Sequence, residues 1–550
     1  MEKFDLRTIK NKKPFRRVVN NETAALLGRE FYSDHDPQYT PGINKYVMMT
    51  QADFLEEYYP EGHLIFDTNY FPDIWREVAD TVNDANGNPL YDENGEEIKK
   101  TSVYCERVPR YAFPFQQIIA SEHIAHATGN DVQHELAVSN PSEQQEKLFD
   151  AMCSAWTGHN MELAWYQAFK SREITADAAF VGSLDENGEF SWRVFSFLEG
   201  DHLYPHYDRY GKLAYFARVT NQYDEENNEV SETIEVWDDT NFYVFRRNKG
   251  DNRSIIEKAK DALGFDNYTL IDHGTHGFAF IPVAYVRDND GPGWSPSQSQ
   301  IDCYELSFSQ MAHNNQAYGE AILVLKSDSE IPVGITRDLS GSVKQIDLQG
   351  ENDQASYLEG QSASESYMKQ LDVCEDSIYR GSNAVKVPRE LKAGDTPASA
   401  IKLLFANALN QAAADGMECE EFLGDMWRIF AYAYGYMNNC ILDAMRLPVL
   451  NWIKPFIHLS ESAVVADLVA LKGANILSAQ TSQERASFYA KPGEMRRIQR
   501  EQKTQQDLEL LYEREQLEAQ TSAKERLAKA SQNTNEGAAQ ASEEEGGNNE

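Results

Sequence analysis

The sequence lacks the cysteine spacing that defines zinc sites and disulfide frameworks. The six cysteines in 550 residues are scattered and form no CxxC pair, at positions Cys105, Cys153, Cys303, Cys374, Cys419 and Cys440. We therefore expect free, buried thiols in a reducing compartment. The chain also has no run of about eighteen apolar residues, so no membrane span is expected. Its basic first residues have no apolar core and do not predict a secretory signal.

Motifs of catalysis are missing as well. There is no GxSxG nucleophile elbow and no Walker A loop, and the Gly-Pro-Gly turn at 291–293 lacks the lysine of a phosphate cradle. His123 and His126 could share a helix face, but no third ligand stands at a metal-site spacing. His273 and His276 occupy a Gly-flanked loop without a nucleophile motif. We predict no catalytic centre, no metal site and no cofactor.

Positive charge is scarce. The chain has 51 Lys and Arg against 88 Asp and Glu, a net charge of −37. Phosphate binding needs cations that displace counterions, so this chain should not hold nucleic acid tightly. The charge argues against a DNA-binding regulator but not against a DNA conduit, because an acidic wall repels the duplex and lets it slide.

Apolar residues, in contrast, make up 41 % of the chain, enough for a substantial core. The length predicts two to four domains or one large elaborated domain. The first 45 residues are polar and basic at first and are interpreted as an arm. A helix is expected at 51–59, and two Asn-Gly turns predict a hairpin or surface loop at 82–99. The apolar spacing from Ser142 to Ser171 predicts a helix.

The next part of the chain has short runs rich in β-branched and aromatic residues, separated by turns. This pattern predicts a twisted antiparallel meander with aromatic faces. The expected strands cover residues 178–182, 190–197, 203–207, 213–223, 232–237 and 241–246.

A long amphipathic helix is expected after the turn at 291–293, ending in the apolar run 321–325. One set of its positions is separated alternately by three and four residues: Ile301, Tyr304, Phe308, Met311, Asn315, Tyr318 and Ile322. One interpretation is a helix packed against neighbouring subunits of a ring, where the polar Asn315 would fix the register. The other is an ordinary core helix of a monomer, which the pattern alone favours.

A second amphipathic helix is expected at 367–379, with Leu371 and Ile378 on its apolar face. Short apolar pieces and glycines between 326 and 362 favour a small insertion of strands. The segment 382–397 has no periodicity, and its composition alone is typical of a solvated surface loop. It carries three cations, Lys386, Arg389 and Lys392.

A third helix is predicted to begin at Pro397, and Gly416, Gly424 and Gly435 predict a break or bend in it. Charged helices follow, residues 508–527 being interpreted as a solvated extension. Residues 528–550 are rich in Gln, Asn, Gly and Glu and are expected to be disordered.

The order of these segments resembles one family. A strand, a Gly/Pro break, two helices bracketing a small insertion, a basic loop and a long helix are similar to the stem, clip and tunnel-loop region of tailed-bacteriophage portal proteins. The run at 176–223, ADAAFVGSLDENGEF followed by SWRVFSFLEGDHLYPHYDRYGKLAYFARVTNQY, resembles the portal wing. The run at 458–501, which begins HLSESAVVADLVALKG, resembles the C-terminal helices of that family. The resemblance covers residues 110–510.

The resemblance implies an α+β portal fold with an α/β wing, a two-helix stem, a small α/β clip, a tunnel loop, a long helix and an α-helical crown. The implied regions are an N-terminal arm at 1–45, wing at 46–295, stem helix 1 at 296–326, clip at 327–362, stem helix 2 at 363–381, tunnel loop at 382–397, long wing/crown helix at 398–445, crown at 446–516 and an extended or disordered tail at 517–550.

The resemblance also implies a function. The family forms a non-enzymatic ring, by resemblance twelve-fold, at one capsid vertex, through which DNA enters during packaging and leaves during ejection. The implied partners are double-stranded DNA, the large terminase subunit, head-completion and tail adaptors, and major capsid and scaffolding proteins. The chain would be assembled in the host cytoplasm and located in the virion, with no membrane association.

Residue roles follow from the same resemblance. Lys386, Arg389 and Lys392 would lie at the narrowest ring around the DNA. The residues implied in packing between subunits are Ile301, Tyr304, Phe308, Met311, Asn315, Tyr318, Leu371 and Ile378. Two alternatives stay open: another structural virion protein, such as an adaptor or minor capsid protein, or an intracellular hydrolase that uses His273 or His276.

Overall fold

The computed structural model of the chain divides into two compact units, and its mixture of helices and sheets is α+β, as the sequence predicts. The first unit comprises Met1–Leu391 and Lys402–Ile457, and the second comprises Lys392–Ile401 and His458–Glu550. The structure describes residues 6, 9–10, 12–18, 31–33, 45–81, 90–92, 98–185, 187–224, 226, 228–249, 254, 256, 267–318, 322–326, 336–337, 343–345, 354–358, 364–386, 403–456, 468–474, 502–503, 505–506, 508–527 and 529.

The first unit begins with a small antiparallel sheet in the order β1-β3-β2, so the described residues of the expected arm form paired strands. A helix follows where it was predicted, and a Thr50–Asp53 capping box closes its N-terminus. The elements are β1 (Phe15–Val18), β2 (Phe31–Ser33), β3 (Lys45–Met49) and α2 (Gln51–Tyr58).

Two long strands then pair with each other on either side of the segment predicted as a hairpin or surface loop, and most of that segment lies outside the described residues. This pairing agrees with the hairpin alternative. A buried helix and a short strand come next. These elements are β4 (Ile74–Thr81), β5 (Lys99–Glu106), α3 (Phe115–Thr128) and β6 (Gln133–Leu136).

The predicted helix from Ser142 to Ser171 is two helices, α4 (Glu143–Gly158) and α5 (Met161–Thr175). Asn160 adopts a left-handed conformation, with φ of 55°, and separates them. Asparagine tolerates this conformation better than most residues, so a local turn interrupts an apolar spacing that looked continuous.

The predicted meander is confirmed in a five-stranded antiparallel sheet of order β13-β12-β11-β10-β9. The first two expected strands pair elsewhere, in a three-stranded sheet of order β14-β7-β8. The strands of the larger sheet are β9 (Asp201–Tyr207), β10 (Leu213–Tyr223), β11 (Glu229–Trp237), β12 (Asn241–Asn248) and β13 (Thr269–Thr275). Those of the smaller sheet are β7 (Asp177–Leu184), β8 (Phe190–Phe195) and β14 (Val283–Arg287).

Strand β7 is buried on both faces, which explains its run of small apolar residues. Ala178 and Phe180 face the helical core, whereas Ala179 and Val181 face a second core that contains Phe216 of the larger sheet. Successive side chains of a strand point to opposite faces, so β7 links the two cores.

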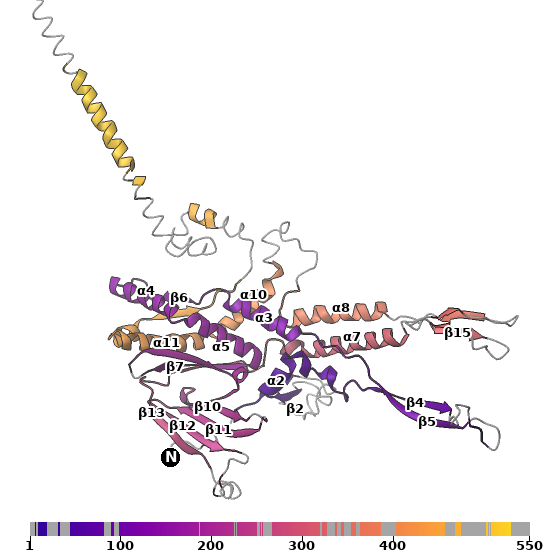
Figure 1. Cartoon of the computed structure of the whole chain (residues 1–550). Coiled ribbons are helices and arrows are strands. Elements are labelled where there is room, and N and C mark those ends of the chain that lie inside the picture. The colour runs from indigo at the N-terminus through magenta and orange to yellow at the C-terminus, as the bar shows by residue number, and fades with distance from the viewer. Residues whose placement is uncertain are drawn as a thin grey trace, which may run out of the picture. The chain divides into compact units, whose positions relative to one another are not determined.

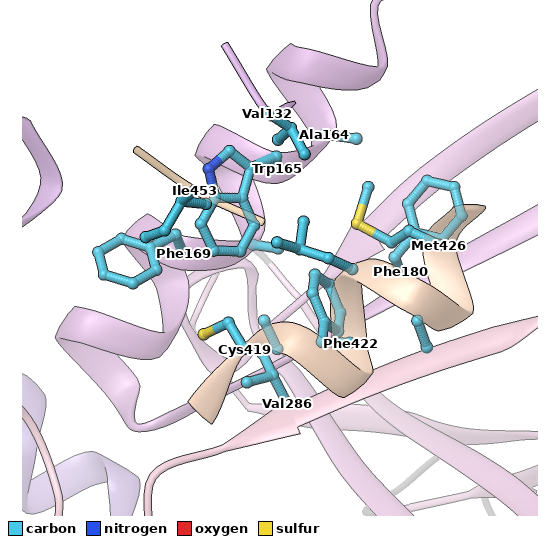
Figure 2. Close-up of a cluster of buried hydrophobic side chains, with 14 of the residues drawn as sticks. Val132, Ala164, Trp165, Phe169, Phe180, Val286, Cys419, Phe422, Met426 and Ile453 are labelled. Carbon is cyan, nitrogen blue, oxygen red and sulfur yellow. The ribbon is translucent and has the colours of Figure 1, made fainter. Parts of the chain in front are cut away.

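The helical core gathers residues from segments far apart in the chain. Figure 2 shows Trp165 and Phe169 of α5 together with Phe422 and Met426 of α11 (Glu420–Met437) and Phe180 of β7. The rings of Trp165 and Phe422 lie 6.3 Å apart, centroid to centroid. Full burial of one such side chain contributes about 3 kcal/mol to the free energy of unfolding.

The helix expected after the Gly-Pro-Gly turn is α7 (Gln298–Tyr318), but it ends before the apolar run that was predicted to complete it. That run is strand β15 (Ile322–Lys326), paired with β18 (Gln354–Leu358), so the prediction of helix through residue 325 is wrong. Its residues Ile322, Leu323 and Val324 include two β-branched side chains, which favour a strand. A second pair, β16 (Thr336–Arg337) and β17 (Val343–Gln345), lies between them in the sequence.

The second amphipathic helix is α8 (Ser364–Gly381), which agrees with the prediction. Figure 1 shows α7 and α8 side by side. The third predicted helix is divided at Cys419, close to Gly416, where a break was expected, and β19 pairs with β6. The remaining elements are α10 (Ala406–Glu418), α11 (Glu420–Met437), α12 (Ile441–Arg446) and β19 (Val449–Trp452).

In the second unit, residues 508–527 form a helix with every side chain exposed, which confirms the expected solvated helix. The helix therefore includes residues 517–527, which the implied regions assigned to an extended or disordered tail. Among the residues that the structure describes, no helix has the length and apolar character needed to cross a membrane.

Candidate functional site

Helices α7 and α8 form an antiparallel pair within one chain. The Ser297 hydroxyl donates to the Ile378 carbonyl at 2.8 Å, just before α7 begins. Further along, the Cys303 and Cys374 thiols lie 3.8 Å apart, and Gln370 donates to the Ser307 hydroxyl at 2.9 Å. Residue numbers in these contacts rise along α7 and fall along α8, so the two helices run in opposite directions.

We call the α7 and α8 positions that were predicted to pack between subunits the seam. The first part of the seam on α7 faces this chain's own core. Ile301 is fully buried. The rings of Tyr304 and Phe308 lie 5.1 and 5.0 Å from the ring of Phe113, and Phe308 also lies 5.3 Å from Tyr111. These distances are typical of aromatic packing, so these three seam positions pack within the chain.

The seam residues of α8 are also internal, whereas the far end of α7 is open. Leu371 and Ile378 are buried. Met311 is half-buried and Asn315 is exposed, while the side chain of Tyr318 lies outside the described residues. Among the predicted positions whose side chains the structure describes, Asn315 near the end of α7 is the one that is exposed.

A buried carboxylate fixes α7 to the segments that precede it. Glu305 Oε1 accepts hydrogen bonds from His63 Nδ1 at 2.7 Å and from the Phe113 amide at 2.8 Å. His63 Nε2 lies 2.9 Å from the Glu57 carbonyl. Both ring nitrogens of His63 therefore face acceptors, which requires a proton on each. Burial lowers the pKa of His63, but Glu305 outweighs burial and leaves it above the ordinary value.

The segment after α8 is held to α3 by two adjacent residues. His123 Nε2 donates to the Ser382 carbonyl at 2.8 Å, and the Glu122 carboxylate accepts from the Val385 amide at 2.7 Å. Asn383 donates to Gln411 of α10 at 3.0 Å. Two of these contacts use backbone atoms of the segment, so they fix its path whatever side chains it carries.

Lys386, the first cation of the predicted tunnel loop, turns back to α8. Its Nζ lies 2.8 Å from Asp376 and 3.2 Å from Glu375. The hydrogen bond with Asp376 is the main reason that the pKa of Lys386 is raised. Arg389 and Lys392 lie outside the described residues.

Arg172 is the centre of a buried ionic cluster that includes Glu173, the partner of His123. Its guanidinium lies 2.9 Å from Glu173, 3.4 Å from Asp415 and 3.2 Å from Asp288. Burial raises the pKa of both Asp288 and Asp415 to about 6, although Arg172 opposes the change. Burial also favours the neutral form of Glu173, but His123 and Arg172 hold its pKa below the ordinary value.

The other histidines singled out in the sequence have structural partners. His126 Nδ1 donates to the Phe456 carbonyl at 2.7 Å. His276 is buried, with Nε2 2.9 Å from the Asp238 carbonyl and Nδ1 accepting from the Phe278 amide. His273 is exposed on β13. Within the described residues, no group of three or more potential ligands could hold a metal ion.

Sequence reasoning found His123 but not what it does, and it missed Glu122, His63 and Glu305 as anchors. Several of their partners lie 192 residues or more away in sequence, as in the pairs His63–Glu305 and His123–Ser382. Short-range spacing carries no signal of such contacts. The adjacent Glu122 and His123 among the apolar positions of α3 were the available hint, since buried polar side chains need partners.

Comparison with known proteins places the chain in a class of structural proteins of bacteriophage particles rather than among enzymes. Its residues 106–508 match the family model of phage portal proteins described as SPP1 Gp6-like, and the chain belongs to this family. Strands β1 to β4 and nearly all of β5 precede the matched range. Family membership implies an oligomeric ring and a place in the virion at a capsid vertex. No curated protein matches the chain.

Proposed function

We propose that the chain forms a twelve-subunit ring at one capsid vertex, through which DNA is packaged and ejected. The observation that carries this proposal is the antiparallel pair α7–α8, which brackets two short strand pairs within the range matched by the portal family. Such a helical pair could line a channel, and the small insertion between its helices could bind partner proteins at one end of that channel.

The regions of the ring are assigned from the described elements. The two sheets and α3 to α5 form the wing, α7 and α8 form the stem, and β15 to β18 form the clip. The segment 382–397 is the tunnel loop, and α10 and α11 belong to the long helix between wing and crown. The stem helices thus begin at the core of the wing and end at the clip.

Subunits contact one another through surfaces that the chain's own core leaves open. Ile301, Leu371 and Ile378 are occupied internally, so they support the stem from within a subunit. The exposed Asn315 and the half-buried Met311 are the seam positions still available to a neighbouring stem. A polar side chain in such an interface fixes register at some cost in stability.

The net charge of −37 supports passage of DNA rather than binding. Repulsion keeps the duplex from adhering to the wall, and a few cations at the narrowest point make brief phosphate contacts. Because Lys386 is paired with α8, Arg389 and Lys392 are the cations we assign to DNA contact. The clip would dock the terminase during packaging and tail adaptors afterwards, and the wing would meet capsid and scaffolding proteins.

The test is complementation of a phage that lacks its own copy of this chain. Expression of the intact chain should restore DNA-filled heads, and particles should carry it at a single vertex by immunogold labelling. Filled heads without the chain, or labelling distributed over the whole capsid, would overturn the proposal and favour another virion component.

A further inference from the structure

His123 is placed so that both of its ring nitrogens donate. Nδ1 lies 3.2 Å from a carboxylate oxygen of Glu173 on α5, and Nε2 lies 2.8 Å from the Ser382 carbonyl after α8. Neither partner can donate when Glu173 is ionised, as its lowered pKa indicates. Only the doubly protonated imidazolium satisfies both contacts.

The surroundings of His123 are closed. Its side chain is 3 % exposed, as is that of Glu173. A Cβ atom added at Gly293 would lie 2.5 Å from His123 Nδ1 and 2.7 Å from Glu173 Oε2. The Gly-Pro-Gly turn therefore packs directly on the His123–Glu173 pair, and only glycine leaves space for it.

The charged groups near His123 lie on three helices. Glu122 and His126 share α3, Arg172 and Glu173 lie on α5, and Asp415 lies on α10. Asp288, which follows β14, and Glu418 of α10 pair with Arg172. Burial lowers the pKa of His123, but Glu173, then Asp415 and the Ser382 carbonyl, outweigh burial and raise the pKa above its ordinary value. Arg172 lies on the far side of Glu173 and balances the acidic neighbours.

We propose that His123 is the positioning residue that fixes where the tunnel loop leaves the stem, and that it does so only while its imidazole is doubly protonated. The tie between this contact and DNA movement rests on the proposed function. Together with Glu122, His123 holds Ser382 and Val385 against α3. Loss of one ring proton removes one donor, because a neutral imidazole can donate to Glu173 or to Ser382 but not to both.

Hydrogen–deuterium exchange of the intact assembled chain tests the contact. We expect amides of residues 382–386 to exchange about tenfold faster in His123→Gln than in the wild type, because one charged hydrogen bond is lost. His126→Gln is the matched control on the same helix and should leave these amides protected. Equal protection in His123→Gln and the wild type would overturn the proposal.

The pH dependence of amide protection in the wild-type chain tests the proposal even if His123→Gln fails to fold. After correction for intrinsic exchange, protection of residues 382–386 should fall as pH rises through the pKa of His123. Deuterium exchange at the imidazole C2 atom measures that pKa directly, and we expect a value above about 6.5. A lower value, or protection that does not follow it, would contradict the proposal.

A DNA-packaging assay distinguishes failure of this inference from failure of the proposed function. We expect rings of His123→Gln to assemble and to package less DNA than rings of His126→Gln. Faster exchange with unchanged packaging would overturn the role of His123 at the tunnel loop. If the wild-type chain forms no ring, the proposed function fails, whereas the exchange result still decides whether His123 holds the segment.

Discussion

The thiols of Cys303 and Cys374 lie 3.8 Å apart, one on each helix of the α7–α8 pair, although 71 residues separate them in the sequence. Both are free cysteines and neither is fully exposed. Burial, with Cys303 nearby, raises the pKa of the Cys374 thiol to about 11, so little thiolate forms at neutral pH and oxidation of the pair is slow.

This proximity predicts an internal crosslink under forced oxidation. Treatment with diamide at pH 8.5 should join Cys303 to Cys374 within one chain, since a larger thiolate fraction forms there. Peptide mapping should find that link, and Cys374→Ser should abolish it. Crosslinks between chains at these two positions would show that α7 and α8 pair across subunits instead.

The two ends of the α7 seam should respond differently to truncation. Phe308→Ala removes ring contacts within the chain and should lower the free energy of unfolding by about 2 kcal/mol, less than for a fully buried Phe. Asn315→Ala, at an exposed position, should leave unfolding within about 0.5 kcal/mol and change ring assembly instead. Denaturant unfolding of the monomer and native mass spectrometry measure the two effects. Weaker assembly in Phe308→Ala without loss of stability would reverse this assignment.

The cations of segment 382–397 should not be equivalent. Lys386→Ala removes a side chain already paired with Asp376 and Glu375, so DNA packaging should change little. Arg389→Ala with Lys392→Ala should reduce packaging or retention of DNA while rings still assemble. The number of filled heads per infected cell gives the measurement. A larger defect in Lys386→Ala than in the double variant would refute the proposed DNA contacts.

Stability should fall as pH rises from about 4 to 7. Burial raises the pKa of Asp302 to about 7, and Asp288 and Asp415 titrate at about 6. Because the unfolded chain ionises these groups near pH 4, the folded state binds more protons between pH 4 and 7 and is stabilised there. His123 acts in the same direction, since its raised pKa favours folding until the pH passes that value. Melting temperatures across this range provide the test.

One variant isolates the largest of these contributions. Asp302→Asn resembles the protonated carboxyl, so it should raise the melting temperature at pH 8 and flatten the profile. Asp372→Asn, at an exposed position of α8, is the control and should leave the profile unchanged. A steeper profile in Asp302→Asn would mean that the carboxylate is stabilised in the folded state.

The sequence predicted those elements whose residues carry a local signal. The meander, α2 and α8 are examples, because turn residues and periodic apolar positions define them. The end of α7 was mispredicted because Ile322 continues the helical spacing by chance, whereas β-pairing with Leu358 decides its structure. Of the α7 positions that the spacing marked, Ile301, Tyr304 and Phe308 pack within the chain. Spacing cannot distinguish a neighbour in the same chain from one in another subunit.

The most direct test of the central claim is the native mass of the purified chain, measured by light scattering together with negative-stain images. The portal assignment predicts rings of about twelve subunits with a central hole, in keeping with closed cyclic symmetry. A monomer at every protein and salt concentration, with no ring in any image, would contradict it.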